Sequence, residues 1–204
     1  MKNKAATTIL ILFLFLCLLT SCKKTELKSI TISDFRLQNS KPDFGKVSTQ
    51  ISEHLNTVFP NSKQVGISIK SKHGLSTSLD NTKIVFVYIS DSTKNFLNTS
   101  KVSILAVLTV ETGNVDFLEN KVSEYVTDGP DISSENLNIN SIVEIALEKI
   151  SSLDVSPNNP ITLAYLENYW RVDCLPFEDS FEYTCSFGIE GESHEIMYEL
   201  PIVN

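Results

Sequence analysis

The chain has 204 residues, of which 42% are hydrophobic and 21% are charged, so it can bury the core of one domain or of two small ones. Its formal net charge at pH 7 is −8. This acidic balance argues against nucleic acid or anionic lipid as a partner, because both are bound through clusters of Lys and Arg.

The first residues have the organisation of a secretory signal. Two lysines precede an apolar run from Ile9 to Leu19, which at about 11 residues is too short for the roughly 20 of a membrane-spanning helix. The run ends in Leu19-Thr20-Ser21-Cys22, which resembles the lipobox of bacterial lipoproteins. That resemblance implies cleavage after residue 21 and acyl chains such as palmitate on Cys22. The alternative is an ordinary cleaved signal with an incidental cysteine.

A lipid on Cys22 would place the protein in the bacterial cell envelope, on the periplasmic side of the outer membrane if the cell is Gram-negative. Removal of residues 1–21 would leave 15 basic and 25 acidic groups, a formal charge of −10. Residues 22–40 are predicted to be a lipidated tether. Within it, Ile30, Ile32 and Phe35 belong to an alternating stretch that fits either an edge strand or part of the tether.

Residues 41–127 are predicted to form a first α+β unit. A helix is expected between Asp43, as its N-cap, and Pro60, because apolar residues recur at helical spacing: Phe44, Val47, Ile51, Leu55 and Val58. Strands are expected at residues 65–69, 84–89, 102–110 and 115–118, the last pair joined by a turn at Thr112-Gly113-Asn114. The continuous apolar run at 84–89 predicts a central strand buried on both faces.

Residues 128–138 are predicted to be a linker, and residues 139–204 a second α+β unit. Its helix begins near Asn140, a plausible N-cap, and presents one apolar face: Ile139, Ile142, Val143, Ala146, Ile150 and Leu153. The segments around Pro157 and Pro160 end this helix.

The C-terminal segment predicts a meander with one apolar face. A two-residue turn at Asp179-Ser180 would place Cys174 opposite Cys185, and a second at Gly191-Glu192 would bring Tyr198 beside Cys185. In an oxidising exported compartment, this register predicts a disulfide between Cys174 and Cys185. Two buried thiols are the alternative.

The sequence contains no HExxH, GxSxG, GxxxxGK[ST] or GxGxxG motif, and His54, His73 and His194 are not spaced as metal ligands. We therefore predict no catalytic residue, no metal site, no cofactor and no enzymatic activity. The carboxylates around Gly191 are interpreted as a solvated hairpin tip rather than a calcium site.

Aromatic residues gather around the predicted C-terminal hairpin. Tyr165 and Tyr169 are expected to point away from the helix and are candidates for partner contact. The alternative is ordinary packing between neighbouring strands.

The stretch Ile139–Ile150 resembles the helix of a PepSY domain. The stretch Val107–Val115 is similar to that family's strand, turn and strand, although Thr109 stands where the family has Asp. The resemblance implies a small exported binding or inhibitory module without catalysis. Together with the element pattern, it predicts two tandem helix-plus-antiparallel-sheet units, PepSY-like, with separate sheets or sharing one sheet. One irregular α+β domain is the alternative.

These observations predict a membrane-anchored envelope lipoprotein that serves as a non-enzymatic binding or inhibitory module for a protein or peptide partner. A lipoprotein that binds a small ligand or a metal ion, and an envelope hydrolase of unfamiliar type, are the alternatives.

Overall fold

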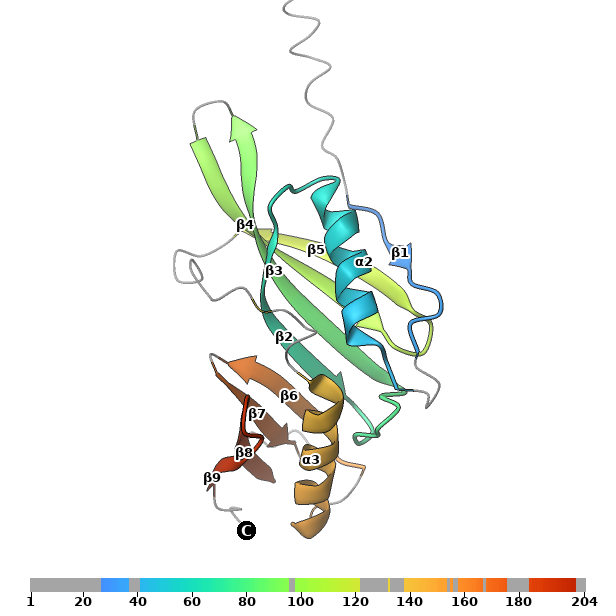
Figure 1. Ribbon diagram of the computed structural model, residues 1–204, viewed down its shortest axis with the longest axis vertical. Helices are drawn as coiled ribbons and strands as arrows, with labels where there is room; N and C mark the ends of the chain where they lie inside the picture. The colour runs from blue at the N-terminus through green and yellow to red at the C-terminus, as the bar shows by residue number, and fades with distance from the viewer. Residues whose placement is uncertain are drawn as a thin grey trace, which may run out of the picture.

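The computed structural model describes residues 27–36, 41–95, 98–121, 132, 138–153, 155, 158–166, 168–175 and 184–200 (Figure 1). The predicted signal segment, Cys22, the turn at Asp179-Ser180 and all but two residues of the predicted linker lie outside these ranges.

The described residues form two helices, α2 (Phe44–Asn56) and α3 (Ile139–Ser152), and one antiparallel sheet in the order β1-β5-β4-β3-β2-β6-β7-β8-β9. The strands are β1 (Ile30–Thr31), β2 (Lys63–Ser71), β3 (Thr82–Asn95), β4 (Asn98–Thr109), β5 (Asn114–Lys121), β6 (Ile161–Leu166), β7 (Tyr169–Cys174), β8 (Cys185–Glu190) and β9 (Ile196–Leu200). The strands predicted in the first half are present, although most are longer than expected.

The predicted fold class of two tandem α+β units is wrong, because a single nine-stranded sheet runs through the whole domain and makes the protein mainly β. The two halves join where β2 pairs with β6, from Ser68 opposite Ala164 to Ser71 opposite Ile161. Each strand edge must satisfy its backbone N–H and C=O groups, and β6 does so for the edge of β2 that β3 leaves open. Alternating polarity in a sequence does not identify so distant a partner.

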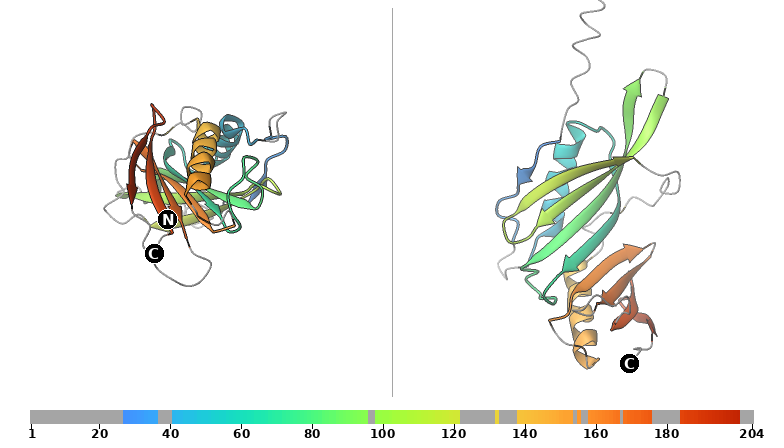
Figure 2. Two further views of the ribbon diagram at one scale, coloured as in Figure 1. Left: turned by 90° about the horizontal axis from the view of Figure 1, so that it is seen from below. Right: turned by 180° about the vertical axis from the view of Figure 1, so that it is seen from behind.

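Both helices lie on the same face of the sheet, and the sheet curves around them (Figures 1 and 2). The helical spacing recognised in the sequence supplies their buried stripes, including Val47 and Ile51 in α2 and Ile142 and Ala146 in α3. These side chains belong to the same hydrophobic cluster as the inward side chains of the strands, from Ile32 to Ile189. The described domain therefore has one core.

The first residues of α2 and α3 lie close together and are joined by polar contacts. Asp43 is the N-cap of α2, as predicted, and its carboxylate accepts a hydrogen bond from the Lys46 backbone N–H at 3.0 Å. The prediction of Asn140 as the N-cap of α3 is wrong, since this helix begins after Asn138. Asn140 instead donates its side-chain N–H to the Pro42 carbonyl, 3.2 Å away, beside an ion pair between Lys41 and Glu144.

The stretch around Ile30 is an edge strand rather than a free tether. Ile30 and Thr31 pair with Val115 and Asn114, and the Ile32 N–H donates to the Gly113 carbonyl at 2.9 Å. The side chains of Ile32 and Phe35 are buried in the core.

The last strand has a different register from the predicted one. The connection between β8 and β9 spans residues 191–195 rather than two residues, and the pairing shifts between Gly188 and Ile189. Tyr198 consequently lies opposite Gly188, on the sheet face away from the helices, and not beside Cys185. Glu199 turns toward α3, where its carboxylate is 2.6 Å from the Lys149 ammonium.

The single core can be tested with Ile51, which is fully buried in α2. We expect Ile51→Ala to lower the free energy of unfolding by about 2–4 kcal/mol, because it leaves a cavity. The denaturation midpoint should fall equally by far-ultraviolet circular dichroism and by fluorescence of Trp170, the only tryptophan, which lies in β7.

Glu53→Ala is the matched control, since Glu53 is exposed on the same helix and its removal should change stability by less than about 0.5 kcal/mol. An unchanged Trp170 midpoint in Ile51→Ala would contradict the single core.

Candidate binding face of the sheet

The sheet face opposite the two helices, called here the open face, is not covered by any described element (Figure 2). Its side chains differ along the sheet. Those of β3 to β5 include several apolar residues with lysines around them, whereas those of β7 to β9 include tyrosines and an ion pair.

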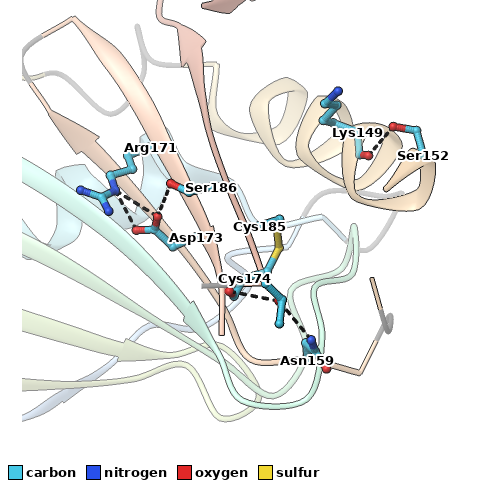
Figure 3. Close-up of a disulfide and its surroundings, with 9 residues drawn as sticks. Lys149, Ser152, Asn159, Arg171, Asp173, Cys174, Cys185 and Ser186 are labelled. Atoms are coloured by element: carbon cyan, nitrogen blue, oxygen red, sulfur yellow. Dashed lines mark hydrogen bonds and ion pairs between the residues drawn. A yellow bond between two sulfur atoms is a disulfide. The ribbon is translucent and has the colours of Figure 1, made fainter. Parts of the chain in front are cut away.

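The second part centres on the aromatic cluster, defined as Tyr169, Arg171, Asp173, Ser186 and Tyr198. The Tyr169 and Tyr198 rings meet edge to face, with centroids 6.0 Å apart. Asp173 accepts from Arg171 Nε at 3.0 Å and from the Ser186 hydroxyl at 2.7 Å (Figure 3). These bonds fix the carboxylate, and they hold the guanidinium on the open face.

Small residues make room for this cluster. Ala164 and Gly188 lie opposite Arg171 on the two neighbouring strands. The Tyr198 ring occupies the space that a Cβ atom on Gly188 would fill. Burial, together with the neighbouring Tyr169, raises the pKa of Tyr198 above its usual value. A tyrosine hydroxyl is protonated at neutral pH even without this rise, so it can donate a hydrogen bond.

The two tyrosines predicted to be partner contacts lie on opposite faces. Tyr169 is half-buried on the open face. The expected direction of Tyr165 is wrong, because it pairs with Trp170 on the helix side and its ring lies 5.4 Å from the Trp170 ring. Burial, followed by repulsion from Glu190 and Glu192, raises the pKa of Tyr165. Tyr198 was missed because the predicted turn put it in the wrong register.

The cysteine pair lies on the helix side. Cys174 is opposite Cys185, as the predicted register required, with Cα atoms 4.8 Å apart and a disulfide between them (Figure 3). Both residues are buried. Backbone hydrogen bonds flank the pair. The Thr184 N–H donates to the Cys174 carbonyl at 2.9 Å, and the Leu175 N–H donates to the Pro160 carbonyl at 2.8 Å. The disulfide therefore cross-links β7 and β8 inside the core.

The histidines lie apart from one another. The His54 ring donates from Nε2 to the Lys28 carbonyl at 3.0 Å, and it packs on Phe117. His73 is exposed in the bend after β2, and His194 lies in the turn before β9. Within the described ranges, no three His, Cys, Asp or Glu side chains are grouped so that they could hold a metal ion.

The hairpin tip around Gly191 is held by the side chain of Glu190. The Glu190 carboxylate accepts the N–H groups of Ser193 and of Glu192, the latter at 2.8 Å. These hydrogen bonds lower the pKa of Glu190. The carboxylate therefore shapes the turn.

Comparison with protein-family models, curated proteins and solved structures found no match for this chain. None of the helices in the described part of the chain is long and apolar enough to cross a membrane.

The disulfide between Cys174 and Cys185 gives a chemical prediction. Reduction should add the mass of two hydrogen atoms, and it should lower the free energy of unfolding by roughly 2–3 kcal/mol, because the unfolded chain loses a short closed loop. Intact-mass measurement and denaturant unfolding, each with and without reductant, test this. In the double variant Cys174→Ser, Cys185→Ser, reductant should have no effect. Alkylation of both cysteines without reductant would contradict the disulfide.

Proposed function

We propose that this chain is a membrane-anchored envelope lipoprotein whose domain is a non-enzymatic binding module for a protein or peptide. The observation that carries the binding role is the aromatic cluster on the open face, next to the exposed strand β9. Tyrosine and arginine are the side chains that contribute most to binding at many protein interfaces, because they combine a large contact area with polar groups.

Strand β9 supports the same role. It is the last strand of the sheet, paired with β8 on one side and with no described strand on the other. Two of its apolar side chains are exposed, Ile196 at 40% and Met197 at 55%. An exposed strand edge offers backbone N–H and C=O groups to an extended peptide, and neighbouring side chains select its sequence.

The membrane anchor is supported by the Leu19-Thr20-Ser21-Cys22 motif after its short apolar run. Acyl chains on Cys22 hold the domain at a bilayer by burying methylene groups, at about 0.8 kcal/mol each. The domain then needs only to recognise its partner close to the membrane.

Lipidation is tested with Cys22→Ala. The wild-type chain should incorporate labelled palmitate and enter the detergent-rich phase on phase separation, whereas the variant should do neither. Cys174→Ala is the matched control and should keep the label, since Cys174 is buried and paired with Cys185. Equal labelling of Cys22→Ala and wild type would contradict the anchor.

The binding role is tested by placing the photo-reactive amino acid benzoylphenylalanine at Tyr169 or at Met197 in cells. Irradiation should join the chain to the same partner from both positions, giving one adduct of defined mass. Glu148, which is exposed on α3, is the control position and should give no such adduct. Absence of an adduct from Tyr169 and Met197, or the same adduct from Glu148, would contradict a partner at this site.

A further inference from the structure

The open face of β2 to β5 carries an apolar patch, which we define by five residues: Val85, Val87, Leu105, Val107 and Leu118. They alternate with inward side chains such as Phe86 and Ala106, so they point away from the helices, and none belongs to the core cluster. The sequence predicted a strand buried on both faces at 84–89, yet both helices cover the same face. One-sided sheets normally carry polar residues on the uncovered face, so this patch calls for a covering surface.

Lysines surround the apolar patch. Four exposed lysines lie on the same face of the same strands: Lys63, Lys70, Lys83 and Lys101. Two aspartates, Asp91 and Asp116, share this part of the face. The local balance is therefore positive in a chain whose overall charge is −8. The overall negative charge argued against binding to anionic lipid, but this part of the open face is basic and apolar.

The N-terminal segment brings this face close to the proposed anchor. Ile30 pairs with Val115 on β5, the strand that carries Leu118, whose side chain is 54% exposed. Only four residues lie between Cys22 and Leu27, the first described residue, so the five steps of a fully extended tether span at most about 17 Å. A lipid on Cys22 would hold the bilayer surface within that distance of the β1–β5 edge.

We propose that the open face of β2 to β5 docks on an anionic bilayer surface, with its lysines at the lipid phosphates and Leu118 entering the headgroup region. The nearness argument rests on the proposed lipidation of Cys22, whereas the charge and apolar arguments do not. The sheet curves so that β8 and β9 stand steeply against β3 and β4 (Figure 2, left). Docking by β2 to β5 therefore leaves the aromatic cluster accessible to a partner from the side.

The test uses the mature chain from Lys23, without lipid, and vesicles of phosphatidylcholine alone or of equal parts phosphatidylcholine and phosphatidylglycerol. This chain keeps the whole described core, which draws on residues from Leu27 onward. Flotation should show binding to the anionic vesicles only, weakening as sodium chloride rises, because salt screens the lysines.

Two matched pairs of substitutions distinguish the effect of lysines on the open face from the effect of net charge on vesicle binding. Lys70→Gln with Lys83→Gln should weaken binding about 25-fold, at about fivefold per lysine. Thr49→Glu with Gln50→Glu on α2 changes the net charge by the same amount and should have little effect, since these residues lie on the opposite side. Leu118→Ser should weaken binding without changing its salt dependence.

Membrane docking would be overturned if the unlipidated chain did not bind anionic vesicles or bound both kinds of vesicle equally. It would also be overturned if the lysine substitutions and the α2 substitutions weakened binding equally. The outcome of the Cys22→Ala experiment is independent of this one, because that experiment measures lipid attachment and not the contact of the sheet with the bilayer.

Discussion

The pairing of β2 with β6 is the contact on which the rest of the domain depends. Backbone hydrogen bonds between Ser68–Ser71 and Ile161–Ala164 convert what would be two small sheets into one, and they bring the start of α3 near the start of α2. Each helix alone would cover too little sheet to exclude water from its apolar side, whereas the joined core is continuous from Ile32 to Ile189. The link between Asn140 and the Pro42 carbonyl follows from this arrangement.

Local features of this fold could be predicted from the sequence because local spacing determines them. The apolar stripe and the Asp43 cap define α2, and the alternation around Cys174 and Cys185 defines their register. The β2–β6 pairing could not be predicted, because neither strand carries a mark of its distant partner. The same reason explains why two units were expected: each half, read alone, has a helix and strands.

The candidate site was only partly accessible to sequence reasoning. Tyr169 was recognised, but Tyr165 and Tyr198 were assigned to the wrong faces, since one extra residue in a turn or a shift in pairing reverses every side chain beyond it. The apolar face of β3 was visible in the run at 84–89, yet a sequence cannot say whether a buried second face is covered by the chain itself or by something outside it. This face, which no described element covers, is the basis for the proposed contact with a membrane.

The place where β1 joins the sheet would matter if the chain is held by a lipid on Cys22, as proposed. Any pull between the membrane and the domain would pass through a two-residue strand at the edge of β5, supported by the contact between His54 and the Lys28 carbonyl. Because β1 is antiparallel to β5 and lies at the margin, such a force would detach it before it disturbed β2 to β4. Under such a force, β1 would separate from β5 first, and the pairing of the inner strands would stay intact.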